Sequence, residues 1–165
     1  MKKIIIFFIY SLFSFEFANA LISVDITRGN LDPLPIAVSP LHVDPKSVNY
    51  KDIKVKQLGE KISKIVETNF KNTGLFNPLK KDAFVQKPDI AHLKPRFEDW
   101  RLIKAQALVT GKLLVKDEKL KVEFRLWDTT ASKEMIALAF TTTPSNWRRV
   151  AHIISDKIYE RLTGE

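Results

Sequence analysis

The sequence predicts a mixed α/β domain with a partly antiparallel sheet of about five strands, on which two long helices and one short helix pack. Two segments carry apolar residues at helical spacing, and several short runs alternate apolar and polar side chains. Hydrophobic residues make up 45% of the chain, which is typical of a folded domain. The chain contains no cysteine, so the core must hold the fold without disulfides.

Residues 1–20 have the order of a cleavable secretory signal. A basic start precedes an apolar run, and Ala18 and Ala20 occupy the two positions that a signal peptidase reads. Polar residues interrupt the apolar run, which makes an uncleaved membrane anchor the less favoured alternative. We therefore expect cleavage after Ala20 and export of residues 21–165 to the periplasm, with no insertion into a membrane. Without a cysteine at the cleavage site, the exported chain cannot be a bacterial lipoprotein.

The exported chain begins with a short run of strand-forming residues, Leu21–Arg28, in which alternate side chains share one face. A cluster of helix and strand breakers follows, from Gly29 to Pro33. We expect residues 21–33 to form a detachable strand and a hinge, with Gly29 and Pro33 as the hinge residues. The alternative is an edge strand that only closes the domain.

The next segments predict a buried strand and a long helix. Pro35–Pro40 is apolar and bounded by prolines. From Val55 onward, apolar residues recur at helical spacing, and Gly74 can adopt the left-handed conformation that ends a helix. We expect three further elements, namely a short extended piece, a polar loop and a short helix, at Leu75–Leu79, Lys80–Lys94 and Phe97–Ile103.

Three strands are predicted in the second half of the chain. Ala107–Val115 is apolar on nearly both faces, which is typical of a central strand. Leu120–Trp127 alternates apolar and polar residues, and Met135–Thr142 forms the third strand. Turns at residues 116–119 and 129–134 connect these strands.

A second long helix follows from Trp147, with apolar residues on one face as far as Leu162. We expect Ser145 or Asn146 to cap its start and Gly164 to end it.

Two groups of residues allow more than one interpretation. Trp127 lies on the otherwise polar face of its strand, and we favour its burial under the final helix over exposure as an anchor for a partner. Arg148 and Arg149 follow Trp147 and could bind phosphate. Cations oppose the dipole at the start of a helix, however, so a packing or salt-bridge role is favoured.

The sequence gives no support to a catalytic or metal site. His42, His92 and His152 are far apart and have no metal-ligand spacing. Glu98 and Asp99 are adjacent, so their carboxylates would point in different directions on a helix. No phosphate-binding glycine loop or nucleophile motif is present. We expect no catalytic residue, no cofactor and no metal.

The net charge of +8 is compatible with weak attraction to acidic partners or anionic lipid. The lysines are scattered among acidic residues and are not interleaved with aromatic ones. The expected address also lies outside the cytoplasm. We therefore expect no nucleic-acid partner.

Several stretches together resemble the N-terminal domain of the TolB family, periplasmic proteins of the Tol-Pal envelope system. The strongest match is the final helix, and the set covers essentially all of the exported chain. In the order of the family, the matching stretches are Pro35–Val38, Gly74–Leu79, Gln106–Gly111, Val122–Asp128 and Asn146–Glu165.

The resemblance implies a non-enzymatic protein-binding module, which we expect to be a monomer. In the family, the segment after the signal peptide binds the C-terminal domain of TolA, and it is docked or free according to whether Pal is bound. The module would support outer-membrane integrity and envelope constriction at cell division. The resemblance places TolA binding on Leu21, Ile22, Ser23, Val24, Asp25, Ile26, Thr27 and Arg28.

Members of the family continue past this helix into a six-bladed β-propeller that binds Pal, whereas this sequence ends at Glu165. We expect a fragment of a longer protein or the product of a split or truncated gene, with Pal as a partner only if a propeller is present elsewhere. Two alternatives remain. One is a truncated TolB fragment without function, and the other is a free-standing periplasmic regulator of peptidoglycan synthesis with a similar domain.

Overall fold

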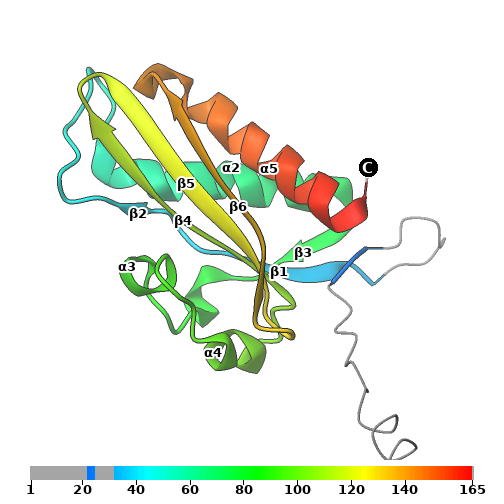
Figure 1. The fold of residues 1–165 in the computed structure, drawn as a ribbon. Helices are drawn as coiled ribbons and strands as arrows, with labels where there is room; N and C mark the ends of the chain where they lie inside the picture. The colour runs from blue at the N-terminus through cyan, green and yellow to red at the C-terminus, as the bar shows by residue number, and fades with distance from the viewer. Residues whose placement is uncertain (1–21, 25–31, 165) are drawn as a thin grey trace, which may run out of the picture.

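A computed structural model describes residues 22–24 and 32–164. Six strands form one mixed sheet, with the path β3-β1-β4-β5-β6 and β2 paired to β4 (Figure 1). The bounds are Leu34–Val38 for β1, His42–Val43 for β2, Phe76–Pro78 for β3, Ala107–Lys116 for β4, Lys119–Asp128 for β5 and Lys133–Thr142 for β6. The mixed, partly antiparallel sheet predicted from the sequence is confirmed.

The sheet has a parallel half and an antiparallel half that meet at β4. Strand β1 runs parallel to β3 and β4, and β2 also runs parallel to β4. Strands β4, β5 and β6 form an antiparallel meander. The predicted central position of Ala107–Val115 is confirmed, because side chains on both faces of β4 are buried.

The turn between β4 and β5 has two residues, Asp117 and Glu118, both with positive φ angles, of 49° and 57°. This conformation matches the right-handed twist of the two strands. Glycine usually occupies positions with this conformation, whereas here two acidic residues adopt it. A register shift between Leu126 and Trp127 marks a bulge in the pairing of β5 with β6.

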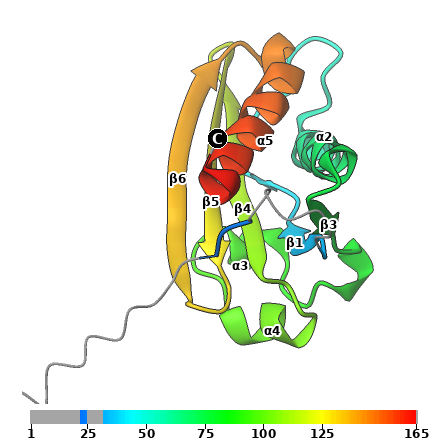
Figure 2. The same cartoon turned by 90° about the vertical axis from the view of Figure 1, so that its right-hand side faces the viewer.

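Two long helices, α2 (Leu58–Thr73) and α5 (Trp147–Thr163), lie side by side over one face of the sheet (Figure 2). Short 3-10 turns at Val55–Gln57 and Pro144–Asn146 lead into them. Both helices end at a left-handed glycine, Gly74 with φ of 71° and Gly164 with φ of 81°, as predicted. Asn146 stands at the cap position of α5, but its side chain donates to Thr142 Oγ1 (3.1 Å) and makes no cap bond.

A larger core lies between the sheet and these two helices. It joins alternate residues of the strands, such as Ile36 and Val109, to Ile62 of α2 and Ile154 of α5. A second, smaller core lies on the opposite face of the sheet. Its buried members are Ala37, Ala91, Trp100, Ala105, Leu108 and Trp127.

Two predictions for this second face were incomplete. A polar loop was expected over residues 80–94, whereas the structure has a 3-10 turn at Lys81–Ala83 and a short helix α3 at Pro88–Ala91. The short helix predicted at Phe97–Ile103 is confirmed as α4, Phe97–Leu102. The described domain therefore has two short helices where one was expected, because single helical turns leave no periodicity in the sequence to read.

The N-terminal side of the domain differs from the sequence-based expectation in two places. The two-residue strand β2 was not foreseen, since a run this short has no pattern of its own. A strand was expected over Leu21–Arg28, yet Ile22–Val24 belong to no strand. The other residues of that range lie outside the described part of the chain. No helix in the described residues is long and apolar enough to cross a membrane.

Helix α2 lies so close to the connection between β1 and β2 that the two backbones share a hydrogen bond. The Leu41 N–H donates to the Gly59 carbonyl (3.4 Å), and Ser63 Oγ donates to the Ser39 carbonyl (3.0 Å). A Cβ atom built on Gly59 would lie 2.0 Å from the carbonyl oxygen of Leu41. Gly59 therefore permits the close approach of α2 to this connection.

We predict that Gly59→Ala lowers the free energy of unfolding by about 2 kcal/mol or more, since overpacking against fixed backbone costs about that much. Alanine would gain up to about 1 kcal/mol in helix propensity over glycine. The clash exceeds this gain because the nearest atom belongs to a backbone carbonyl. Urea denaturation measures the change, and Lys61→Ala on the exposed face of the same helix should stay within about 0.5 kcal/mol of wild type.

Candidate functional site

The described part of the N-terminal segment, Ile22–Val24, lies against the end of α5 and the end of β5 (Figure 2). The Ile22 N–H donates to Asp128 Oδ2 (3.0 Å), and the Val24 N–H donates to the carbonyl of Leu162 (2.7 Å). Ile22 and Val24 are half-buried against the larger core, while Ser23 between them is exposed. This alternation is that of an extended peptide with one face on the domain.

Asp128 is the last residue of β5 and is 1% exposed. Its Oδ1 accepts a hydrogen bond from the Ala131 N–H (2.7 Å), which closes the turn into β6. Its Oδ2 accepts the bond from Ile22. One carboxylate therefore shapes the turn and holds the N-terminal segment.

Leu162 lies in the last turn of α5, where backbone carbonyls have no partner further along the helix. Its carbonyl oxygen accepts the N–H of Val24. The docked segment thus satisfies an acceptor that the end of a helix leaves open. We call the surface made by Asp128 and the end of α5 the docking site.

Among the described residues, two hydrogen bonds join the segment Ile22–Val24 to the docking site. Two hydrogen bonds contribute about 1 kcal/mol each, and partial burial of Ile22 and Val24 contributes about 1 kcal/mol each. Fixing the backbone of three residues costs about 1–2 kcal/mol per residue. The two sums are of similar size, so these contacts alone hold the segment only marginally.

The other predicted site residues fall into two groups. Pro33, predicted as a hinge residue, is exposed and immediately precedes β1. The remaining ones lie outside the described residues, and no structure is assigned to them. They are Ala18 and Ala20 at the predicted cleavage site, Leu21, Asp25, Ile26, Thr27 and Arg28 of the predicted binding segment, and Gly29 of the predicted hinge.

Sequence reasoning missed Asp128 and Leu162 as parts of the site. The sequence predicts a turn directly after Asp128, at residues 129–134, but no binding role for its carboxylate. For Leu162, the sequence pattern indicates only a core position in the final helix. Nothing in the sequence connects either residue to Ile22, because 106 positions separate Ile22 from Asp128.

Trp127 is buried, so its interpretation as an exposed anchor for a partner is wrong. The prediction that the final helix buries Trp127 is also wrong. The indole belongs to the smaller core and not to the core beneath α5. Phe97 of α4 contacts it edge to face, with ring centroids 5.7 Å apart, and Trp127 Nε1 donates to Thr110 Oγ1 (2.9 Å). Trp127 thus alternates in the ordinary way with Leu126, which faces the larger core.

Arg148 packs over the ring of Trp147, with its guanidinium carbon 4.3 Å from the ring centroid. This confirms the favoured packing role for Arg148, and no described contact tests it for Arg149. Arg149 is exposed.

The histidines, far apart in the sequence, are partly brought together by the fold. The rings of His42 and His92 stack with centroids 4.4 Å apart and planes inclined by 4°, which joins β2 to the end of α3. His152 lies elsewhere, on α5, where its ring contacts the Asn69 side chain. Within the described residues, no three His, Cys, Asp or Glu side chains are placed to share a metal ion.

Burial lowers the pKa of His42 below its usual value, and the neighbouring His92 lowers it further. The carboxylates of Asp89 and Asp44 act in the opposite direction, and Lys112 adds to the lowering. The neutral ring of His42 is therefore the form that the folded domain favours.

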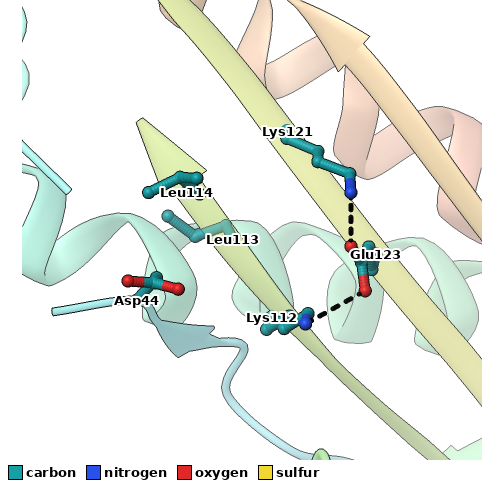
Figure 3. A pocket seen from close by; sticks show the side chains of 6 residues that line it. All are labelled: Asp44, Lys112, Leu113, Leu114, Lys121 and Glu123. Atoms are coloured by element: carbon teal, nitrogen blue, oxygen red, sulfur yellow. Dashed lines mark ion pairs between the residues drawn. The ribbon is translucent and has the colours of Figure 1, made fainter. Parts of the chain in front are cut away.

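A small pocket beside β2 is lined by charged residues of β4 and β5 (Figure 3). Glu123 pairs there with Lys121 (2.8 Å) and Lys112 (3.3 Å). The hydrogen bond from Lys121 lowers the pKa of Glu123, and Lys112 contributes in the same direction. The lysines leave this carboxylate ionised at neutral pH, as a structural ion pair on a half-exposed face.

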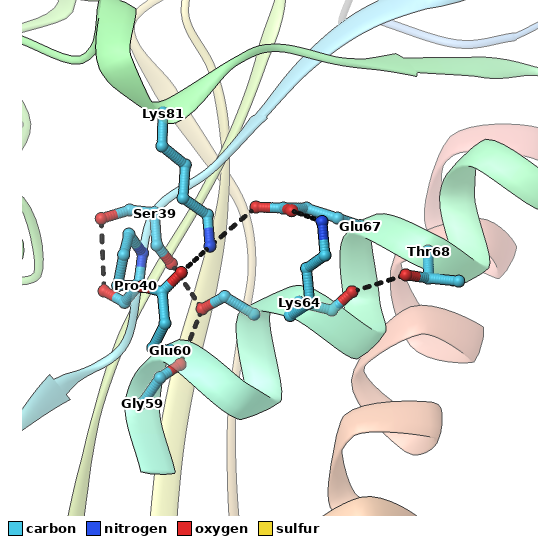
Figure 4. A network of polar contacts seen from close by, with 9 residues as sticks. Ser39, Pro40, Gly59, Glu60, Lys64, Glu67, Thr68 and Lys81 are labelled. Atoms are coloured by element: carbon cyan, nitrogen blue, oxygen red, sulfur yellow. Dashed lines mark hydrogen bonds and ion pairs between the residues drawn. The ribbon is translucent and has the colours of Figure 1, made fainter. Parts of the chain in front are cut away.

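A second polar cluster joins α2 to the chain after β3 (Figure 4). Lys81 contacts both Glu60 and Glu67, and its Nζ lies 3.0 Å from the Oε1 atom of Glu67. Lys64 reaches the same carboxylate at 3.8 Å. These ion pairs hold the polar segment after β3 against the helix.

The fold and the docked segment define a class of protein: an α/β domain that binds an extended part of its own N-terminal side, residues 22–24, through backbone hydrogen bonds. Residues 22–135 match the family model described as the TolB amino-terminal domain, and the chain belongs to this family. The Tol-Pal system protein TolB of Pelagibacter ubique (strain HTCC1062) is 71% identical over 150 residues, which are 90% of this chain and 34% of that protein. The chain thus spans about a third of the length of this curated relative.

Two solved structures resemble the fold. The crystal structure of TolB from Acinetobacter baumannii superposes with a TM-score of 0.63 and 22% identity, over 81% of this chain and 29% of that one. The hypothetical protein CT253 from Chlamydia trachomatis gives a TM-score of 0.55 and 13% identity, over 80% of this chain and 99% of that one. At these identities the likeness shows the fold alone.

We predict that the domain becomes less stable as the pH falls below about 6.5, the usual pKa of histidine. The folded pKa of His42 lies below the unfolded one, so the unfolded chain binds more protons near pH 6. The stabilisation from neutral His42 is complete above the unfolded pKa and is lost as the pH falls through that window.

Urea denaturation between pH 5 and pH 7.5 checks this prediction. His42→Gln should reduce the pH dependence, whereas the control His152→Gln should retain it. An identical pH dependence in wild type and His42→Gln would contradict the assignment to His42.

Proposed function

We propose that this chain is a periplasmic adaptor of the Tol-Pal system whose mature N-terminal segment, Leu21–Arg28, binds the C-terminal domain of TolA. Membership of the TolB amino-terminal domain family supports a role in this system. The observation that carries the proposal is that Ile22–Val24 lie extended against the domain, joined to it by two described backbone N–H groups. By the balance of energies above, releasing the three described residues from the domain costs little.

An extended segment offers a partner its backbone groups as well as one apolar face. Ile22 and Val24 face the domain, and both of their N–H groups are engaged there. In the free state the same groups could add a strand to a sheet of TolA. Docking and TolA binding would then compete for one set of hydrogen bonds and one apolar face.

The composition of residues 1–20 supports the proposed location of the adaptor. We propose that residues 1–20 are a signal peptide, cleaved after Ala20, and that residues 21–165 act in the periplasm. There the chain would work as a monomer with no catalytic step and no cofactor. Its contribution would be to outer-membrane integrity and to envelope constriction at cell division.

Control by Pal would need a part of the protein beyond this domain. In the TolB family the Pal-binding surface belongs to the propeller, and no described residue of this chain forms one. We therefore propose that residues 21–165 bind TolA with the same affinity in the presence and absence of Pal.

Deleting residues 21–27 from the chain that starts at Leu21 should abolish binding to the C-terminal domain of TolA, because the proposed contact surface is removed. Isothermal titration calorimetry measures the affinity. The fold should persist, since the buried members of the larger core begin at Leu34, and Ile22 and Val24 only pack against it from outside. Circular dichroism verifies this point.

A double substitution of two exposed apolar residues, Leu93→Ser and Leu102→Ser, is the matched control and should leave the affinity for TolA unchanged. Both residues belong to the α3–α4 side of the domain, and neither takes part in the hydrogen bonds of Ile22 and Val24. Unchanged affinity after the deletion would refute the proposal. Loss of affinity in the control alone would move the TolA site to the α3–α4 surface.

A further inference from the structure

Asp128 is a buried carboxylate without a cationic partner among the described residues. It is 1% exposed, and the ion pairs between described side chains do not include it. Its two oxygens accept one backbone N–H each, from Ile22 and Ala131. Burying a charge is costly unless an opposite charge or several hydrogen bonds compensate it.

The basic side chains around Asp128 are engaged elsewhere or lie in solvent. Lys133 is opposite Asp128 in the pairing of β5 with β6, but it is exposed. Arg101 donates to the Thr129 carbonyl (2.8 Å), and Arg161 donates to the carbonyl of Met135 (3.3 Å). Each of the two arginines therefore binds a neutral carbonyl instead of the carboxylate.

The other half of the docking site is also electronegative. Leu162 is in the last turn of the 17-residue helix α5, and the carbonyl end of a helix carries a partial negative charge of about half an elementary unit. The segment Ile22–Val24 thus lies between a buried carboxylate and a helix C-terminus. Such a place favours a cation, and the described part of the segment offers it only neutral N–H donors.

Cleavage after Ala20 would place a cation beside this site. Leu21 lies just outside the described residues and is joined covalently to Ile22. An α-ammonium on Leu21 would stand one residue before Ile22, whose N lies 3.0 Å from Asp128 Oδ2.

We propose that Asp128 and the end of α5 form a binding site for an N-terminal α-ammonium group followed by an extended apolar peptide. Removal of residues 1–20 creates this ligand from the chain itself. Before cleavage, the nitrogen of Leu21 is an uncharged amide, and the site has no cation to bind. Processing therefore determines how firmly the N-terminal segment docks.

This inference rests on the proposed cleavage after Ala20 and adds a consequence for TolA binding. If docking and TolA compete for one segment, the new α-ammonium group holds back a segment that would otherwise be free. A chain with extra residues before Leu21 would then bind TolA too readily. The site would distinguish a free N-terminus from an internal segment, because it needs a terminal charge as well as an apolar sequence.

The test compares two forms of the chain, one that starts at Leu21 and one that retains Ala18–Ala20 before it. Hydrogen exchange of the Val24 amide, which donates to Leu162, reports docking. We expect the exchange to be about tenfold faster in the extended form, since charge-assisted contacts are roughly twice as strong as neutral ones. An N-acetylated chain that starts at Leu21 should behave like the extended form. Equal exchange rates in all three forms would overturn the proposal.

Asp128→Asn assigns the effect to the carboxylate and should abolish the difference between the forms. The control Asp156→Asn removes an exposed carboxylate of α5 and should preserve the difference. A difference that persists in Asp128→Asn would show that another group holds the amine, and the assignment would be wrong. The comparison between free and acetylated chains changes no side chain, so it holds even if Asp128→Asn unfolds the domain.

The same preparations separate this inference from the proposed function. Titration with the C-terminal domain of TolA should give a higher affinity for the extended and acetylated forms than for the form that starts at Leu21. If no form binds TolA but Val24 exchange still differs, the proposed function fails and the amine site stands. If TolA binds and Val24 exchange is equal in all forms, the amine site fails and the proposed function stands.

Discussion

The burial of β4 on both faces is the constraint on which the rest of the domain depends. This strand is parallel to β1 and β2 on one side and antiparallel to β5 on the other. Its side chains alternate between the larger core, as Val109 does, and the smaller one, as Leu108 does. The long helices and the α3–α4 segment therefore cover opposite faces of one strand, and each layer is needed because apolar residues of β4 face both ways.

The docking site follows from this arrangement. Strand β5 pairs with β4 along its whole length, so its last residue, Asp128, lies opposite Ala107, the first residue of β4. There the strand leaves the sheet, and α5 ends at Gly164 near the same edge. A buried carboxylate and an open helix carbonyl are thus brought close enough for a short extended peptide to bind both.

A weakly held segment suits the proposed adaptor role better than a permanently paired strand would. The contacts of Ile22 and Val24 roughly balance the entropy lost on ordering three residues. In such a balance, one additional charge interaction shifts the population of the docked state severalfold. The proposed sensitivity to signal cleavage depends on this marginal energy, since a segment fixed by a full ladder of hydrogen bonds would not respond to one charge.

The sequence by itself determined the elements with strong periodicity. Helices α2 and α5, their glycine ends and the three-strand meander were all predicted, because the spacing of apolar residues and the turn residues encode them locally. The family resemblance pointed to the N-terminal segment. Only the tertiary structure decided that Trp127 packs under Phe97 and that His42 stacks on His92. The partners of Ile22 and Val24 were likewise decided there, since Asp128 and Leu162 become their neighbours only through pairing and packing between segments more than a hundred residues apart, which no local pattern records.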